Sequence, residues 1–232
     1  MPDGFLDTHS WWLTGARLEA ESMQRYYETV HAAIHDGEAD FRQRIQDEVD
    51  EDYREYLAED FMERFGTYPR MLRYSQVVAI ANTVEHELRT LGEMCSARVG
   101  VDFSNYAIVT QGWPREFARL HDYLSGACGY QIPVDNDWNF LVDAFILRNA
   151  IAHFGGHTDQ LSSANMRNRA VAFANAQPNV DILPMLMADG TPAGPLHPVA
   201  FRPEFVGDLF TAWNDWLTSV VNEARRQGFT LP

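Results

Sequence analysis

The chain has 232 residues, of which 46% are hydrophobic and 22% charged, and its formal net charge is −15. This composition fits one globular domain and excludes a collagen-like, low-complexity or disordered chain. The acidic balance argues against a duplex nucleic-acid binder with a broad basic face, because neutralising phosphates requires clustered cations.

The cellular compartment is predicted from features that the sequence does not contain. Its two cysteines, Cys95 and Cys128, are too few for a disulfide framework and fit a reduced cytoplasm. The opening MPDGFLD has neither the basic nor the apolar region of a signal peptide. No run of about eighteen apolar residues occurs, so we expect a cytoplasmic protein with no membrane partner.

Two helices are predicted in residues 1–70. The first covers about 14–34, with one apolar side: Leu18, Tyr26, Val30 and Ile34. The second covers about 38–65, where apolar residues recur every four positions, so its stripe drifts by about 40° per step and the helix should bend or change partner. That stripe consists of Phe41, Ile45, Val49, Tyr53, Leu57, Phe61 and Phe65. The acidic run 47–63 is interpreted as a solvated face, and Pro69 is expected to close the following connection.

The clearest helix covers residues 75–98. Its apolar positions alternate spacings of four and three, a seam typical of packing along another long helix. The seam comprises Val77, Ala81, Val84, Leu88, Leu91 and Cys95. Pro114 then opens a short helix, with Phe117, Leu120 and Leu124 on one side. A fifth helix, capped by Asp135 or Asp137, ends near His153 because Gly155 and Gly156 stop it.

The pattern changes after residue 178. Two short apolar runs, 181–187 and 196–201, are separated by turn residues and predict a β-hairpin. Pro203 begins a last helix, whose buried face should comprise Val206, Leu209, Phe210, Trp213, Leu217, Val220 and Ala224. We therefore predict a single domain, residues 1–232, forming an all-α antiparallel bundle with a small hairpin. Residues 1–70 supply N-terminal helices, and 71–232 form the remaining bundle with the hairpin at about 181–201.

The most informative stretch is Arg148-Asn149-Ala150-Ile151-Ala152-His153, at the end of a nearly apolar helix. With Phe145 at the centre of the buried face, Asn149 lies at about +40°, His153 at about +80° and Arg148 at about −60°. Three polar groups thus sit on or beside a packed face. Requiring Asn after Arg lowers the chance expectation of an Arg-x4-His match from roughly 0.6 to roughly 0.03.

These residue types suit chemistry on a phosphate. A guanidinium stays charged and grips phosphate in a fork geometry, whereas imidazole can take and give a proton near neutral pH. Asn149 and His153 are four residues apart, so the amide can orient the ring or bind the same ligand. Arg148 and His153, however, are about 140° apart on an ideal helix, so a loosened last turn or a second subunit is needed to bring them to one substrate.

The same residues can also be interpreted as purely structural. His153 can stabilise the helix dipole, and Arg148 can pair with an acid on another helix inside a purely structural bundle. His31 and His35, one turn apart beside Glu28, have metal-capable spacing, but two histidines do not fill a zinc shell, so we expect a surface pair and no metal. The Trp11-Trp12 pair is expected to form core or dimer contacts.

The segment LRNAIAHFGG resembles the Arg-(polar)-x3-His motif of the HEPN superfamily, and the long helices before and after it agree with that all-helical fold. The resemblance implies a metal-independent, cofactor-free endoribonuclease of the toxin or antiviral type, acting as a homodimer whose motifs share one cleft. Arg148 would bind phosphate, His153 would transfer protons, and Asn149 would be the variable polar position. A subgroup controlled by a nucleotidyltransferase antitoxin has Tyr two positions after the histidine, where this chain has Gly155.

Two functions therefore stand open. The first is cleavage of single-stranded RNA by 2′-hydroxyl attack, leaving a 2′,3′-cyclic phosphate, with an antitoxin or other protein as regulator. The second is a non-catalytic HEPN-like module that binds a partner protein or a nucleotide, which the charge of −15 favours. A positive cleft around Arg148, with Arg167 and Arg169 nearby, would support RNA.

Overall fold

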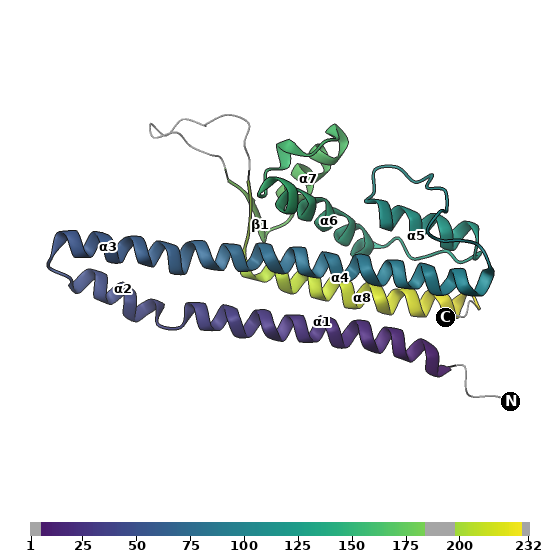
Figure 1. Ribbon diagram of the computed structural model, residues 1–232, viewed down its shortest axis with the longest axis horizontal. Helices are drawn as coiled ribbons and strands as arrows, with labels where there is room; N and C mark the ends of the chain where they lie inside the picture. The colour runs from purple at the N-terminus through teal and green to yellow at the C-terminus, as the bar shows by residue number, and fades with distance from the viewer. Residues whose placement is uncertain (1–5, 184–197, 229–232) are drawn as a thin grey trace.

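The computed structural model describes residues 6–183 and 198–228, with side chains from residue 14 onward, so the Trp11-Trp12 side chains lie outside it. The predicted all-α bundle with a small hairpin is confirmed (Figure 1). In chain order the elements are α1 (Leu6–His35), α2 (Glu38–Asp47), α3 (Glu51–Met62), the π-helical turn η2 (Glu63–Thr67), α4 (Tyr68–Val99), α5 (Arg115–Gly126), α6 (Asn136–Phe154), the 3-10 turn η3 (Thr158–Gln160), α7 (Ala164–Ala176), β1 (Val180–Ile182), β2 (Val199–Phe201) and α8 (Pro203–Arg226).

Helix α4 is the axis of the fold. Helices α1 and α8 run beside it, while α5 and α6 pack on it from the other side (Figure 1). Every residue of the predicted 75–98 seam is buried, and so is every residue of the predicted face of α8. These side chains belong to one hydrophobic cluster that also includes the buried faces of α5 and α6. The seam pattern therefore located the core correctly.

The predicted face of α1 is wrong. Leu18 and Tyr26 are exposed, and the buried residues are Ala16, Ala20 and Tyr27. Alanines allow α1 to lie close to its neighbours α4 and α8, both of which it contacts. Close approach of backbones, which small residues permit, here outweighs the burial of the larger side chains.

The prediction of one continuous helix over 38–65 is also wrong. Chain direction reverses at residues 48–50, and α2 folds back on α3 as a helical hairpin that projects from the bundle (Figure 1). Glu48 Oε1 accepts hydrogen bonds from the N–H groups of Val49 (2.9 Å) and Asp50 (3.0 Å), and Asp50 caps α3 by accepting from Tyr53 N–H (3.0 Å). Short acidic side chains at helix ends satisfy N–H groups that a helix leaves free, which stabilises this turn.

Pro69 does not close a connection, because α3 continues through η2 into α4. Pro69 lies in the first turn of α4, where its missing N–H is tolerated. In η2 the Tyr68 N–H donates to the Glu63 carbonyl, the five-residue spacing of a π-turn. Residues from the two halves of the predicted period-four stripe pack on each other across the hairpin. The centre of the Phe41 ring lies 6.1 Å from that of Phe61 and 5.9 Å from that of Phe65.

Capping residues fix the helices that carry the motif. Pro114 precedes α5 as predicted, and Asp135 caps α6 by accepting from Trp138 N–H at 2.9 Å. Gly155 ends α6 with φ of 60°, and the Gly156 N–H returns to the Ala150 carbonyl at 2.9 Å. Glycine tolerates this left-handed conformation, which explains the stop after the motif.

The loop before α5 is tied down by a buried carboxylate. Asp122 accepts from Val109 N–H (2.7 Å), Thr110 N–H (2.9 Å), the Thr110 hydroxyl (2.6 Å) and His121 Nδ1 (3.1 Å). Burial disfavours its charge, but these hydrogen bonds outweigh burial and lower the pKa of Asp122 to about 2. The carboxylate thus holds the loop as an anion.

The C-terminal part combines confirmed and missed elements. Strands β1 and β2 pair antiparallel, with Val180 opposite Phe201, and the remaining residues of the predicted hairpin, 184–197, lie outside the described part. Helix α7 was not predicted, because its alanines and polar residues give a weak periodic pattern and only Ala170, Phe173 and Ala174 are buried in it. Among the helices described, none combines the length and apolarity needed to cross a bilayer.

Candidate functional site

Helix α6 carries all three residues of the motif. Its Trp138, Leu147 and Ala150 are fully buried, which fixes the helix against the bundle. Arg148 and Asn149 are half-buried at its edge, and His153 is exposed in its last turn. The structure therefore places the motif where the buried face of α6 reaches solvent.

Arg148 is held by side chains of α4. Its Nη2 donates to Asn82 Oδ1 and lies 3.7 Å from Glu85 Oε2. Its Nη1 donates to Asn149 Oδ1 at 2.9 Å, and its Cζ lies 4.8 Å from the centre of the Phe145 ring. The guanidinium is thus fixed against two helices and shares its charge with a carboxylate.

Glu85 belongs to a chain of alternating charges that we call the α4–α5 ion network: Arg148, Glu85, Arg89, Glu116 and Arg119. Arg89 lies 3.6 Å from Glu85 and 3.8 Å from Glu116, and Arg119 lies 3.1 Å from Glu116. Glu116 and Arg119 are both buried, whereas Arg89 is half exposed. The spacings Glu85/Arg89 and Glu116/Arg119 within helices were visible in the sequence, but the pairs between helices were not.

His153 stands apart from this network. Its ring contacts that of Phe154, with centres 6.1 Å apart. Among the described residues no hydrogen bond or ion pair joins His153 to Arg148 or Asn149, which agrees with the angle of about 140° between Arg148 and His153. The structure thus brings Arg148 and Asn149 together and leaves the imidazole on the surface, one turn further along.

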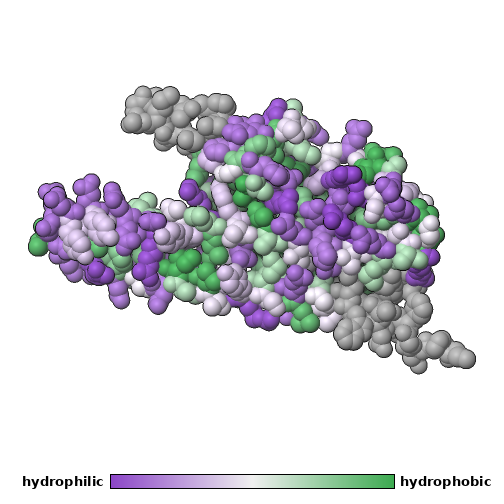
Figure 2. All heavy atoms as spheres, in the orientation of Figure 1, coloured by the Kyte–Doolittle hydropathy of each residue, from purple (hydrophilic) through white to green (hydrophobic). Residues whose placement is uncertain are grey.

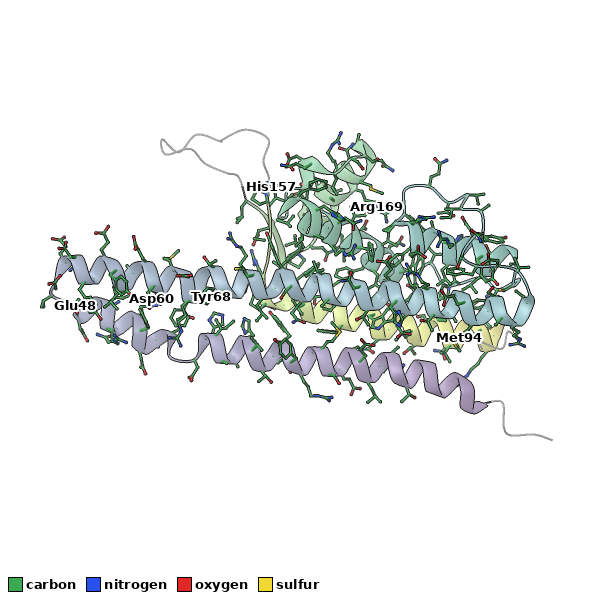
Figure 3. The ribbon with its side chains drawn as sticks, in the orientation of Figure 1. Glu48, Asp60, Tyr68, Met94, His157 and Arg169 are labelled. Carbon is green, nitrogen blue, oxygen red and sulfur yellow. The ribbon has the colours of Figure 1, made fainter. Side chains whose placement is uncertain are left out.

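Two polar groups near the motif were not predicted from the sequence. His157 and Asp159 follow the glycine stop, and the buried atoms His157 Nδ1 and Asp159 Oδ1 have no hydrogen-bond partner. Figure 3 labels His157 beside the hairpin, with which its backbone forms a bridge at Pro198. The spacing His153/His157 was the available signal, since it continues the motif by one turn.

Arg167 and Arg169 do not enlarge a positive surface around Arg148. Arg167 donates to the Leu161 carbonyl at 2.6 Å. Arg169 forms an ion pair with Asp143 and donates to the Gly112 carbonyl at 3.2 Å. Asp143 is about 140° from Arg148 around α6, and it lines a groove of about 440 Å³ together with Asp137, Asp208 and others. None of the motif residues lines that groove.

The histidines of α1 form a pair at the base of the projecting hairpin. The rings of His31 and His35 lie 4.6 Å apart, and His35 Nδ1 lies 2.8 Å from Glu38 Oε2. Burial lowers the pKa of His31, and the nearby His35 and Arg73 lower it further. Glu28 instead accepts from Gln24 at 2.9 Å. In the part of the chain that the structure describes, no three His, Cys, Asp or Glu side chains group as metal ligands.

Comparison of the chain with protein-family models, curated proteins and solved structures finds no match. The residues of α6 and their geometry are therefore the features of the molecule that bear on its function.

Proposed function

We propose that two copies of this chain form a metal-independent endoribonuclease that cleaves single-stranded RNA. The observation that carries the proposal is the arrangement on α6: a guanidinium and an amide locked together by a 2.9 Å hydrogen bond, with an exposed imidazole one turn away. A fixed cation and a mobile proton carrier are the groups that transfer of a phosphate ester requires.

The reaction needs four linked events: two proton transfers, one bond formed and one bond broken. The His153 imidazole of one copy takes the proton from a ribose 2′-hydroxyl, and the 2′-oxygen forms a bond to the adjacent phosphorus. The bond from phosphorus to the 5′-oxygen breaks, and this oxygen receives a proton from the protonated His153 of the second copy. The products are a 2′,3′-cyclic phosphate and a 5′-hydroxyl. Arg148 stabilises the charge that gathers on the phosphate oxygens.

A second copy supplies what one chain lacks. Arg148 and His153 of one motif point about 140° apart, so a single α6 cannot present both to one phosphate. When two α6 helices face each other, His153 of one copy can approach Arg148 of the other. Phosphate would then compete with Glu85, whose oxygen is 3.7 Å from Nη2, for the same guanidinium.

Incubation of purified protein with total RNA in EDTA tests the proposal. The wild type should release fragments with 2′,3′-cyclic phosphate ends, whereas Arg148→Ala and His153→Ala should lose activity by about 10²-fold or more. His86→Ala and Arg115→Ala are matched controls at exposed positions and should keep activity. Cleavage by both motif variants at the wild-type rate would exclude this site, and sedimentation would show whether the active species is a dimer.

The second candidate function is a non-catalytic helical module that binds a partner protein. The pairing of Arg148 with Glu85 and Asn82 favours it, because a guanidinium already neutralised serves structure without any substrate. The same assay separates the two functions, since a module would yield no RNA fragments under any condition. Loss of folding in Arg148→Ala would identify a purely structural role.

A further inference from the structure

The helical hairpin formed by residues 38–67, which we call the arm, is a separate unit of the molecule. It projects beyond the bundle, with Glu48 at its tip and Tyr68 at its base (Figures 1 and 3). Its buried residues Phe41 and Leu57 do not belong to the main hydrophobic cluster. Helices α2 and α3 pack chiefly on each other. The arm is therefore held by its own small core and contributes little to the bundle.

The arm is strongly acidic and yet exposes apolar side chains. It contains eleven Asp or Glu residues and four Arg. Figure 2 shows its surface as mostly hydrophilic. Met62 is nevertheless 65% exposed and Tyr56 is 61% exposed. An exposed methionine and tyrosine among carboxylates keep most of their apolar surface in solvent, and residues of this kind are typical of surfaces that bind other proteins.

A groove of about 710 Å³ follows this surface across the π-turn. Glu55, Glu59 and Glu63 line it at intervals of one turn, Met62 and Gly66 give it an apolar floor, and Arg70 lies at one end. Within the described residues the carboxylates of Glu55 and Glu59 have no ion-pair partner, and the carboxylate of Glu63 accepts a hydrogen bond from the Tyr68 hydroxyl at 3.0 Å. From Glu55 to Arg70 the groove extends for roughly 22 Å, the length of about four helical turns.

We propose that this groove binds a basic amphipathic α-helix of a partner protein. Arginines or lysines one turn apart on that helix pair with Glu55, Glu59 and Glu63, and its apolar residues contact Met62 beside Gly66. A side chain at Gly66 would meet only the end of Met62, at 3.8 Å, so the backbone there is open to a close approach. This is the helix-in-groove mode of recognition, in which the acidic lining of the groove favours a positively charged partner.

Charge selects this occupant over a second copy of the chain. Two arms brought together would place eleven acids of one against eleven of the other, with only four arginines on each to compensate. Like charges in contact repel each other and oppose association, whereas a basic helix gains from the same carboxylates. The proposal does not depend on RNA cleavage, because the arm and the motif lie on different elements.

Fluorescence anisotropy with a labelled helical peptide tests the proposal. The probe is a peptide of about 18 residues with a leucine stripe flanked by arginines, and the control peptide carries glutamates in place of the arginines. The full-length protein should bind the first and not the second. Glu59→Arg and Met62→Ser should each weaken binding about tenfold, because they remove a charge pair and an apolar contact in the groove.

Asp40→Arg is the matched control, since it makes the same change in net charge at an exposed arm residue that does not line the groove. It should change affinity less than about threefold. Equal loss in Glu59→Arg and Asp40→Arg, with no effect of Met62→Ser, would reduce binding to diffuse electrostatics and overturn the proposal. A concentration-dependent dimer that Met62→Ser dissociates would instead assign the groove to a second copy. Both substituted groove residues are exposed, so circular dichroism should show unchanged folding.

Discussion

Replacing Glu116 by alanine tests whether the α4–α5 ion network carries stability. Both Oε atoms of Glu116 lie 3.1 Å from Arg119 Nη1, and the two side chains are each 9% exposed. Removing the carboxylate leaves the Arg119 charge buried, which costs about 3–5 kcal/mol for a buried pair. Arg119 keeps its position over the Phe103 ring at 5.7 Å, so the lower end, about 3 kcal/mol, is expected.

Urea denaturation followed by circular dichroism and tryptophan fluorescence measures this loss. A decrease of about 3 kcal/mol should also lower the Tm by roughly 6–12 °C in a chain of this size. Glu93→Ala, at an exposed position on α4, should stay within about 0.5 kcal/mol of the wild type. Replacing Glu116 and Arg119 together by leucine should bring stability back to within about 1–2 kcal/mol.

If Glu116→Ala is as stable as Glu93→Ala, the ion pair is no more than a solvated surface contact and the prediction is wrong. If the double leucine variant is as unstable as the single alanine variant, the loss comes from packing and not from an uncompensated charge, which also contradicts the prediction.

Two further predictions concern stability. Because the folded pKa of Asp122 is lowered to about 2, its contribution to the free energy of unfolding is complete above about pH 4 and disappears as the pH falls toward 2. Asp122→Asn should therefore be about 2 kcal/mol less stable than the wild type at pH 7 and equal to it near pH 2. Identical acid unfolding curves would contradict this. Gly92→Ala should destabilise the protein by about 1–3 kcal/mol, because a Cβ there would lie 2.5 Å from the Phe103 ring. Gly207→Ala on α8 should stabilise it by about 0.5–1 kcal/mol, because the new Cβ meets nothing within 4 Å. Chemical denaturation of both variants checks that the two effects have opposite signs.

Local sequence rules predicted those elements whose stability is local or whose apolar spacing is regular. The seam of α4 follows from alternating spacings of three and four, and the ends of α6 follow from Asp135 and the two glycines. The buried side of α1 could not be found in this way, because Ala16 and Ala20 contribute little hydrophobic signal and gain their burial from helices far along the chain. Residues 38–65 were misassigned for a related reason: a stripe of period four is compatible with one bent helix or with two helices facing each other. The acidic side chains that cap the turn at residues 48–50 decide between them.

In the candidate site, too, positions within one helix could be predicted from the sequence, whereas contacts between distant segments could not. Helical geometry placed Arg148 and Asn149 beside the buried face and His153 about 140° from Arg148, and the structure keeps them so. Asn82 and Glu85 could not be assigned to Arg148 from the sequence, because they lie 66 and 63 positions earlier and face it only once α4 and α6 have packed.

Those two residues change what Arg148 can do. A guanidinium held by an amide and a carboxylate has lost its rotational freedom before any ligand arrives, so binding phosphate incurs less entropic cost. The same carboxylate lowers the net positive charge that a phosphate meets. Glu85→Gln separates these effects, because glutamine keeps a hydrogen-bonding oxygen and removes the charge. If Arg148 binds phosphate, RNA should bind Glu85→Gln more tightly than the wild type, and the gain should vanish when Arg148→Ala is added. A gain that persists without Arg148 would mean that Glu85 merely repels RNA through the general acidity of the surface.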